Sequence, residues 1–567
     1  MESEFASCRG SRGITLDRCE SIFDDWCDFD EAKSTLVNEG NNQALKPTRV
    51  ILLAVIIAIA VWLGLRLFAS SGSILSQAQK IAAVMSLIES AYVKPPDTGR
   101  LTEGAIEGML KRLDPHSVYI PSSEQKEISE RDLGEFQGIG VSFVIQNELI
   151  TVVSPIVGSP SDRLGIRSGD RIIEIDSVTA YGISEDEVFK RLRGKKGSTV
   201  HIKVLREGLG EPIDFTIVRD DIPIYSVFTS FMIDDSTGYL LLNQFTATTS
   251  SELQQALRKL ENAGMKRLLF DLRNNGGGRL NEAVVTADMF LPAGYTIVSR
   301  KGRTKDDDEI YRSTDPGTHP MWELIVLVNG GSASASEIIA AAVQDLDRGL
   351  VVGQQTFGKG LVQNTYPLND GSVIRLSTAH WYAPSGRLVQ IPYDKGREDY
   401  YAITYQDQSS TAAEKDRVPF KTLSGRTVYG TVGVMPDSTV EDNRITLATA
   451  QIIGSQLVFA LSSKLARESK YKSNDDFEDF RQNYSITDAD LQRLIPMAKE
   501  KGREYSADTI GKDAAYLKSL LKAEIAQLIW NDRDKYYKVL ISEDSVVKTA
   551  IKLFPLAQMT ASHWRRG

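Results

Sequence analysis

Cysteine and histidine are both scarce in this chain of 567 residues. The three cysteines, Cys8, Cys19 and Cys27, all precede residue 46, so the rest of the chain has no disulfide, no thiolate nucleophile and no thiolate metal ligand. The five histidines are scattered and show neither H-x-x-H nor H-E-x-x-H spacing. We therefore expect no metal site and no cofactor.

Nucleotide-binding motifs and basic clusters are also missing. The sequence has neither a Walker motif nor a dinucleotide-binding fingerprint. Its formal net charge is −9, and its lysines and arginines form no dense run, which argues against nucleic acid as a partner. With 42% apolar residues the chain can bury several cores, and its length predicts about three or four domains.

One long apolar run is present, from Val50 to Ala69, and Arg66 is its only charged residue. About twenty helical residues span one bilayer core. We interpret residues 47–69 as a membrane anchor; the alternative is a cleaved signal peptide. Residues 1–46 form a polar, acidic tail, which can also be an upstream extension from a misassigned start. The positive-inside rule places this tail in the cytoplasm and the rest of the chain across the membrane.

Ser334 lies where a buried strand is expected to turn into a helix. The run Leu324 to Val328 predicts the strand, and residues 337–345 carry apolar side chains at helical spacing. A hydroxyl at such a turn lies beside free backbone N–H groups and the positive end of the helix dipole, which suits an oxyanion intermediate. Ser334-Ala-Ser-Glu337 also fits a capping box, in which the serine only caps the helix.

Lys359 and Gln363 follow in a glycine-flanked loop, after a second strand-like run at residues 349–353. Two loops at the same edge of one sheet can bring Lys359 to Ser334. An ammonium group accepts no proton at neutral pH, so a lysine base must be desolvated to lower its pKa. Gln363 can then orient the lysine. The alternative is a solvated loop lysine with no catalytic role.

These segments resemble the carboxy-terminal processing peptidases, also called tail-specific proteases. The resemblance covers roughly residues 75–440, because further family motifs occur in the family's order. They are Asp114-Pro-His-Ser-Val-Tyr119, Gly238-Tyr-Leu-Leu-Leu-Asn-Gln-Phe245, Asp271-Leu-Arg-Asn-Asn-Gly-Gly-Gly278 and Val434-Met-Pro-Asp437. The resemblance implies a crotonase-like α/β core and a serine protease with a Ser-Lys-Gln constellation.

Carried over position by position, the resemblance makes Ser334 the nucleophile, Lys359 the general base and Gln363 its orienting partner. It implies an oxyanion hole made by the backbone N–H of Ala335 and one N–H from the glycine run, for which we choose Gly278.

Other polar residues near these motifs have structural interpretations. Ser332 and Ser336 share the chemistry of Ser334, and only the family pattern selects among the three; we expect the first two to form turns and caps. His116 more simply orders a turn than acts as a triad base. For Asp271 and Arg273 we expect a structural pair at a strand end.

Residues 134–222 resemble a PDZ domain. The resemblance rests on Phe136-Gln-Gly-Ile-Gly-Val-Ser-Phe143 and on Gly169-Asp170 followed by an alternating apolar strand. It implies that a loop binds the terminal carboxylate of a peptide, with the helix Glu185 to Leu192 as the other wall of the groove. The loop residues are Gln137, Gly138, Ile139, Gly140 and Val141. Because Ile139 and Val141 line the loop, we expect a preference for apolar C-terminal residues.

The expected fold class is α/β, and the family resemblance implies a crotonase-like serine protease core. Alternating strands and helices over residues 223–437 predict a mainly parallel sheet with helical cover. An inserted PDZ domain, α+β and mostly β, interrupts the chain before this core. The expected division is residues 1–46 (tail), 47–69 (transmembrane helix), 70–133 (N-terminal helical region), 134–222 (PDZ domain), 223–437 (protease core) and 438–567 (appended C-terminal helical region).

The expected function is that of a serine endopeptidase which recognises protein C-termini through its PDZ domain and cleaves near them. The alternatives are a non-catalytic peptide-binding scaffold on the same fold and another hydrolase or acyl-transfer enzyme. The joint presence of Ser334, Lys359 and Gln363 favours the peptidase. The expected partners are protein or peptide substrates with free C-termini, the membrane, and either a second copy or an adaptor. The expected location is the bacterial inner membrane, with the catalytic region in the periplasm.

Overall fold

The computed structural model describes residues 74–146, 148–206, 208–314, 319, 321–400, 417–441 and 445–565. The predicted tail and the predicted anchor at residues 47–69 lie outside the described residues. Within the described part, no helix is long and apolar enough to cross a membrane. The chain divides into two compact units, residues 1–102 and 103–567. Residues 74–91 form a helix, and α2 (Thr98–Leu110) follows it.

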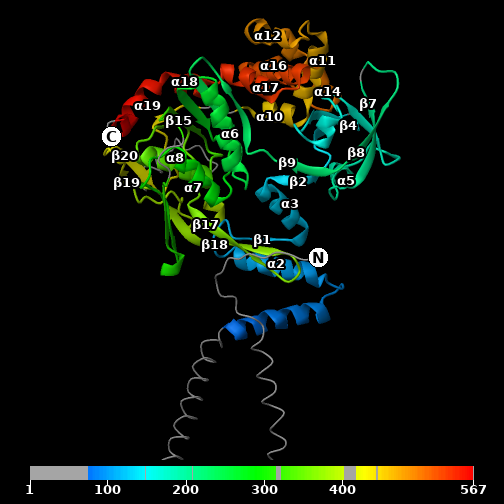
Figure 1. The fold of residues 1–567 in the computed structure, drawn as a ribbon. Coiled ribbons are helices and arrows are strands. Elements are labelled where there is room, and N and C mark those ends of the chain that lie inside the picture. The colour runs from blue at the N-terminus through cyan, green and yellow to red at the C-terminus, as the bar shows by residue number, and fades with distance from the viewer. Residues whose placement is uncertain are drawn as a thin grey trace, which may run out of the picture. The chain divides into compact units, whose positions relative to one another are not determined.

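A six-stranded sheet forms the centre of the protease core, where Figure 1 labels its strand β15. Its strands, in spatial order, are β10 (Val227–Met232), β11 (Thr237–Leu242), β12 (Arg267–Asp271), β15 (Glu323–Val328), β16 (Leu350–Gly353) and β21 (Ser438–Thr439). Strand β10 pairs antiparallel with β11, and all other pairs are parallel. The predicted mainly parallel sheet is confirmed, while the likeness to crotonase-like folds stays a prediction.

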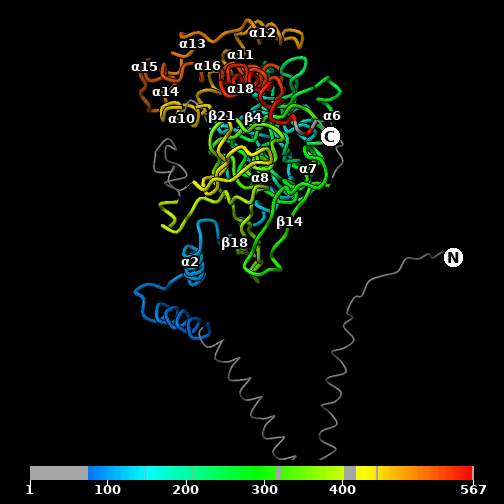
Figure 2. Tube along the Cα trace, turned by 90° about the vertical axis from the view of Figure 1, so that its left-hand side faces the viewer, coloured from blue at the N-terminus to red at the C-terminus, as the bar shows by residue number. Residues whose placement is uncertain are grey.

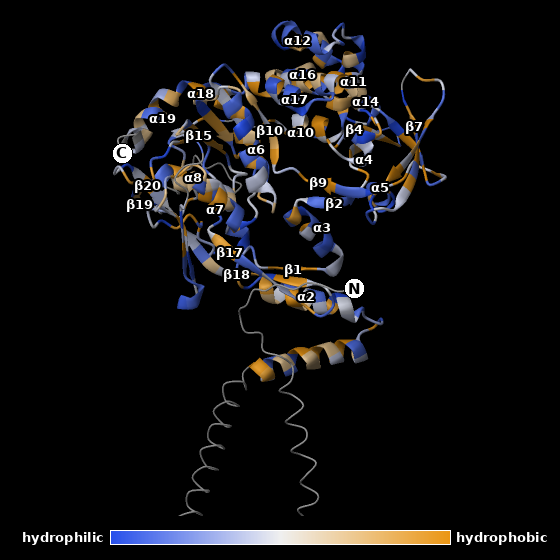
Figure 3. Cartoon of the chain, viewed as in Figure 1, coloured by the Kyte–Doolittle hydropathy of each residue, from blue (hydrophilic) through white to orange (hydrophobic). Residues whose placement is uncertain are grey.

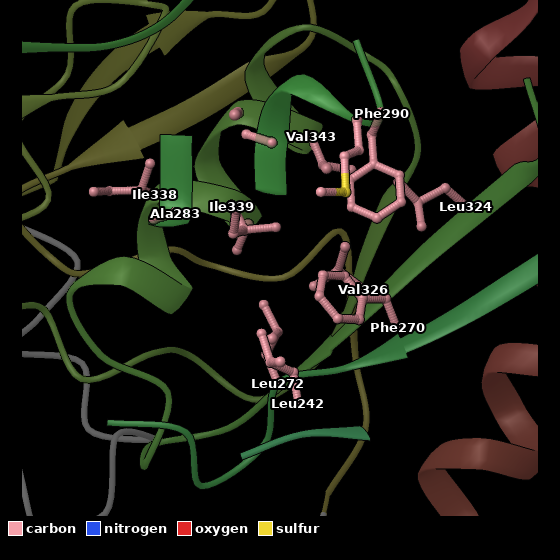
Figure 4. Packing of buried hydrophobic residues seen from close by; sticks show 14 of the residues in the cluster. Leu242, Phe270, Leu272, Ala283, Phe290, Leu324, Val326, Ile338, Ile339 and Val343 are labelled. Atoms are coloured by element: carbon pink, nitrogen blue, oxygen red, sulfur yellow. The ribbon is translucent and has the colours of Figure 1, made fainter. Parts of the chain in front are cut away.

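Three helices cover one face of this sheet: α6 (Thr249–Asn262), α7 (Leu280–Asp288) and α8 (Ala335–Asp345). Every residue of α8 is buried. Figure 4 shows Ile338, Ile339 and Val343 of this helix among side chains of the central strands, such as Phe270 and Val326. The Ser334 turn therefore rests on a fully packed support.

The other face of the sheet is covered by the end of the chain. The short helix η7 (Ile541–Glu543), α18 (Ser545–Lys552) and α19 (Phe554–Thr560) pack their apolar side chains against β11, β12, β15 and β16. Figure 1 shows α18 and α19 beside β15. We call residues 541–560 the C-terminal cover. Both faces of the parallel strands are thus buried, which accounts for the unbroken apolar run of β15.

The rest of the C-terminal region forms a separate helical body, seen from a second side in Figure 2. It contains α10 (Leu447–Gly454), α11 (Leu457–Glu468), α12 (Phe477–Asn483), α13 (Asp488–Gln492), α14 (Leu494–Glu500), α15 (Ala507–Gly511) and α16 (Ala514–Trp530). These helices share a core of their own. In Figure 3, α12 is largely hydrophilic, whereas β15 is hydrophobic. We call residues 447–530 the helical insert. The predicted C-terminal helical region at residues 438–567 is thus divided between two different cores.

The PDZ domain has its own sheet and core. Its strands are β3 (Val141–Gln146), β4 (Leu149–Pro155), β5 (Arg171–Ile175), β6 (Val178–Thr179), β7 (Thr199–Leu205) and β8 (Ile213–Val218), and α5 spans Glu185–Leu192 as predicted. Where the chain enters and leaves this domain, β2 (Glu135–Gly138) pairs with β9 (Asp220–Pro223). The predicted position of Ile139 is wrong. The side chain of Ile139 is only 2% exposed and belongs to the PDZ core, so it does not line the loop.

A second sheet of the protease core brings distant segments together. Strand β18 (Val373–Tyr382) pairs with β17 (Leu361–Pro367), with β1 (Val118–Ile120) and with β13 (Thr296–Gly302), which in turn pairs with β14 (Glu309–Arg312). The Asp114–Tyr119 motif leads into β1, and Gln363 lies on β17. Pairing through β18 therefore places the N-terminal motif beside the lysine segment.

Candidate active site

Ser334 occupies a strained turn directly before α8. Its φ is 55° and its ψ is −110°, a conformation that costs a non-glycine residue about 1–3 kcal/mol. The two neighbouring serines are engaged elsewhere. The Ser332 hydroxyl donates to the Leu272 carbonyl (2.8 Å), the Ser336 hydroxyl donates to the Asn275 carbonyl (2.8 Å), and both are buried. Of the three serines, Ser334 alone is partly accessible.

The Glu337 carboxylate joins the serine turn to the lysine loop. It is fully buried and accepts four hydrogen bonds, from the N–H of Ser334 (2.8 Å), Gly358 (2.7 Å) and Lys359 (2.9 Å) and from the hydroxyl of Thr356 (2.6 Å). Burial raises the pKa of Glu337, and these hydrogen bonds oppose that rise. The predicted capping box is present, but its glutamate also fixes the loop that carries Lys359.

Lys359 is held with its amine in a poorly solvated position. Burial is the main cause that lowers its pKa, and the charge of Arg375 lowers it further. The Lys359 Nζ donates to Gln363 Oε1 (3.0 Å). The structure thus brings these two predicted residues into direct contact, in the environment that a lysine base requires.

The N-terminal motif fixes the orientation of Gln363. Gln363 Nε2 donates to the backbone carbonyl of His116 (2.7 Å), so its amide oxygen faces Lys359. Asp114 holds this turn by accepting from the N–H of His116 (2.8 Å) and of Ser117 (2.8 Å), which confirms that the motif orders a turn. Burial, and then the charge of Lys359, lower the pKa of the His116 ring to about 4, so the ring is neutral at pH 7 and a poor base.

The Ser334 hydroxyl and the Lys359 amine are not bonded to each other. Among the described residues, no hydrogen bond joins Ser334 Oγ to Lys359 Nζ, although the N–H groups of both residues donate to the same oxygen of Glu337. The backbones of nucleophile and base are therefore fixed relative to each other.

The glycine run lies against the nucleophile. A Cβ on Gly277 would come within 2.9 Å of Ser334 Cβ and of the Ala335 nitrogen, and its φ of 98° also favours glycine. The Gly277 N–H is already occupied, since it donates to Asn275 Oδ1 (2.9 Å). In the described part of the chain, the N–H groups of Gly278 and Ala335 have no acceptor. They are the two groups predicted for the oxyanion hole.

Asp271 and Arg273 form a buried pair at the start of this run, as expected. Arg273 Nε lies 3.0 Å from both Asp271 oxygens, and Tyr239 donates to the same carboxylate (2.7 Å). The third partner was not foreseen: Arg273 Nη1 lies 2.8 Å from Asp544, which caps α18 of the C-terminal cover. The cover therefore contacts the start of the segment Asp271–Gly278.

The predicted peptide loop belongs to the PDZ domain and is not joined to the Ser334 site by any hydrogen bond within the described residues. Gln137 bonds instead to Lys196 and Asp221 of the same domain. Gly140 has a φ of 77°, and a Cβ there would lie 2.2 Å from Ser159 Cβ. The second glycine of the G-x-G pattern is thus required by the close approach of Ser159.

Three contributors to the site were missed by sequence reasoning: the carboxylate of Glu337, the carbonyl of His116 and the carboxylate of Asp544. The first two lie within motifs that had been noticed, and their presence in the motifs was the available signal. No local pattern marks Asp544, because its partner is a distant arginine.

Family models match consecutive parts of the chain. Peptidase family S41 matches residues 236–394, the PDZ domain 151–206, the activating protease CtpB N-terminal domain 68–123, and DUF8443, a family of unknown function, 451–531. The last match falls on the helical insert and stops before the C-terminal cover.

Similar proteins carry names from the same family. A carboxy-terminal-processing protease of Bartonella bacilliformis is 39% identical over 318 residues, which are 55% of this chain and 73% of that protein. A probable CtpA-like serine protease of Staphylococcus aureus is 37% identical over 316 residues, covering 55% of this chain and 63% of that protein.

Solved structures with the same kind of name are also similar. The photosystem II D1 C-terminal processing protease has 24% identity and a TM-score of 0.34, and the match covers 65% of this chain and 93% of that chain. The PDZ domain of a carboxy-terminal protease from Vibrio cholerae, in complex with a peptide, has 33% identity and a TM-score of 0.15 and covers 16% of this chain and 97% of that chain. With its S41 match and its extended identity to the Bartonella protease, the chain belongs to peptidase family S41 and is a serine peptidase that contains a PDZ domain.

Proposed function

We propose that this peptidase works by a Ser334–Lys359 dyad that Gln363 orients. The carrying observation is the buried Lys359 amine, which donates to Gln363 while its backbone shares the Glu337 carboxylate with Ser334. The neutral amine accepts the Ser334 proton as Oγ attacks the scissile carbonyl carbon. The oxyanion that forms accepts hydrogen bonds from the N–H groups of Ala335 and Gly278.

Collapse of this intermediate breaks the peptide bond. The leaving amine takes its proton from the Lys359 ammonium, and the N-terminal part of the substrate stays attached to Ser334 as an ester. The neutral lysine then removes a proton from water, which attacks the ester; as the ester bond breaks, the Lys359 ammonium returns this proton to Ser334 Oγ and the second product leaves. Gln363 keeps its oxygen toward Lys359 throughout, because its nitrogen is held by His116.

Cleavage of a loosely folded protein such as casein tests the dyad. We expect Ser334→Ala and Lys359→Ala each to abolish cleavage, since nucleophile and base act as one unit. Gln363→Ala should leave residual activity because it positions and does not react. Ser336→Ala is the matched control: its hydroxyl bonds to the Asn275 carbonyl and should be dispensable for chemistry. Normal turnover by folded Ser334→Ala would disprove the mechanism.

Substrate choice by the PDZ domain is a second part of the proposal. The loop from Gln137 to Val141 would receive a terminal carboxylate, as PDZ domains do, and α5 would form the opposite wall. Phe143 of β3 and Phe189 of α5 lie in ring contact (centroids 5.3 Å apart), so an apolar surface is present between strand and helix. Amidating the C-terminus of a substrate should slow its cleavage, and equal rates would exclude recognition of the terminus.

The membrane location is also a proposal. It rests on the apolar run from Val50 to Ala69 and places the catalytic region in the periplasm. Extraction of bacterial membranes at high pH should leave the full chain in the membrane fraction and release a variant without residues 47–69. Release of both would exclude a transmembrane anchor.

A further inference from the structure

A cleft of about 630 Å³ lies between the PDZ domain and the helical insert, away from the candidate active site. Strands β4 and β5 and the loop before β5 form one wall, while α11, α14 and the end of α16 form the other. Here the Ser168 Oγ of the PDZ domain donates a hydrogen bond to Oδ1 of Asn531 (3.0 Å), the residue that directly follows α16. The cleft has the size of sites that hold small molecules or short peptide segments.

The walls of the cleft are strongly cationic, although the chain as a whole has a net charge of −9. Both bodies contribute. The basic residues are Arg167, Arg171, Arg206, Lys464, Arg467, Lys472 and Lys501, and the acidic residues are Asp170 and Glu500. Such a local excess of positive charge in a concave site concentrates anions.

Within the described residues, several of these cations are not paired with a carboxylate. Arg206 forms a two-bond pair with the buried Asp170 (2.7 and 2.8 Å). Lys472 and Lys501 donate to backbone carbonyls, which carry no charge. In the described part of the chain, Arg171 and Lys464 form no ion pair, and they lie on opposite walls. An anionic ligand would therefore find cations on both sides.

Apolar groups lie between these cations. The insert side of the cleft is lined by Leu457, Phe459, Met497, Leu528 and Ile529. On the PDZ side, Thr151 is 3% exposed, and its hydroxyl is buried with no hydrogen-bond partner among the described residues. A free ion would leave the apolar wall unused, a neutral peptide would leave the cations unused, and a flat bilayer surface would not enter a cleft.

We propose that this cleft binds a peptide segment of a partner protein in which carboxylates alternate with apolar side chains. The carboxylates pair with Arg171 on one wall and Lys464 on the other, and the apolar side chains pack on the α11 and α16 surface. The bound segment links the PDZ domain to the helical insert. This site is separate from the PDZ groove for free C-termini and does not depend on the Ser334 chemistry.

The probe is a ten-residue fluorescent peptide in which glutamate alternates with leucine or phenylalanine. Its ends are acetylated and amidated, so the PDZ loop has no terminal carboxylate to bind. The full chain carries Ser334→Ala to prevent cleavage, and binding is followed by fluorescence anisotropy. We expect the peptide to bind about tenfold or more tightly than its glutamine counterpart, and to bind more weakly as salt is raised.

Charge reversal locates the site. Arg171→Glu combined with Lys464→Glu should weaken binding about tenfold or more, because each wall then repels the peptide. Lys305→Glu is the matched control, since Lys305 is exposed and lies in the protease core. Equal binding of the glutamine peptide, or unchanged binding by the double variant, would overturn the proposal. So would binding of vesicles containing anionic phospholipid in the absence of peptide binding, which would make the cleft a lipid site.

Discussion

The two halves of the C-terminal region differ in the core to which they belong. The helical insert, residues 447–530, buries its apolar side chains among its own helices. The C-terminal cover, residues 541–560, buries its apolar side chains against the central sheet of the protease. The helical insert resembles an added domain, whereas the C-terminal cover supplies one helical layer of the catalytic fold. Adjacency in sequence therefore says little about which half the active site needs.

Helix α17 (Arg533–Leu540) joins the two halves and also contacts the protease. Arg533 donates to the Phe228 carbonyl (3.1 Å), and Asp534 accepts from Thr229 (2.6 Å) and pairs with Lys259 (3.0 Å). Tyr537 packs edge-on against Phe228. The chain thus returns from the insert to the edge strand β10 before it crosses the sheet as the cover.

Removal of the cover should have the largest effect. Deletion of residues 541–567 strips the apolar layer from Leu269, Ile325 and Val352, and exposure of that face should abolish folding of the protease core. Soluble yield, circular dichroism and labelling of Ser334 by a fluorophosphonate measure this. A soluble truncated protein that is still labelled would show that the cover is an appendage after all.

The pH dependence of peptidase activity should depend on the catalytic core and not on the helical insert. Burial and Arg375 lower the pKa of Lys359, and only its neutral amine accepts the serine proton. Activity should therefore rise with pH and level off below the range of an ordinary lysine. Glu524→Gln, in the insert, should leave this profile unchanged. A flat profile of kcat between about pH 5 and 9 would argue against a lysine base.

Paired truncations of buried phenylalanines sharpen the comparison. Phe554 of the cover is 1% exposed and Phe480 of the insert is 0% exposed, so alanine at either should cost about 3–5 kcal/mol. Phe554→Ala should lower the melting temperature of the protease core. Labelling of Ser334 by the fluorophosphonate should be lost at that same lowered temperature. Phe480→Ala should melt the insert first, with labelling retained. Identical melting behaviour of the two variants would make the regions one cooperative unit.

Much of the catalytic fold was predictable because its signals are local. The apolar run before Ser334, the helical spacing after it and the alternation of strands and helices predicted the central sheet and α8. The contacts that complete the site are not local. Glu337 bonds to residues in the following loop, and Gln363 is oriented by a carbonyl of His116 from another part of the chain.

The C-terminal cover was missed for a physical reason. Amphipathic helices show an apolar face in the sequence, but that face does not reveal which surface it covers. Residues 447–560 therefore looked like one helical region. Similarly, the G-x-G pattern predicted the PDZ loop but not the direction of the Ile139 side chain, which packs in the PDZ core.

The insert should show its own dependence on pH. Burial raises the pKa of Glu524 in α16 to about 7, above the value of about 4.5 for an unfolded glutamate. Between about pH 4.5 and pH 7, the folded state therefore holds a proton that the unfolded state has lost. The free energy of unfolding should fall as pH rises through this range. Glu524→Gln should remove the loss and raise the free energy of unfolding at pH 8 by up to about 3 kcal/mol, with little effect at pH 4. Equal effects of the substitution at both pH values would contradict this assignment.

The smallest expected effect concerns the contact between the cover and the segment Asp271–Gly278. Asp544 pairs with Arg273 and also caps α18 by accepting from the N–H of Val546 and Val547. Asp544→Asn keeps a good capping residue and removes only the charge, so Arg273 loses one of its two carboxylate partners. The start of the loop that leads to Gly278 should then become less well fixed. We expect kcat to fall about tenfold, which corresponds to an activation free energy higher by about 1.4 kcal/mol, with KM nearly unchanged.

Asp534→Asn, which weakens a similar contact of α17 with β10, is the control: it should lower the melting temperature without a selective loss of kcat. If both variants lose kcat in proportion to their melting temperature, Asp544 serves stability alone, and the cover supports the active site only by packing.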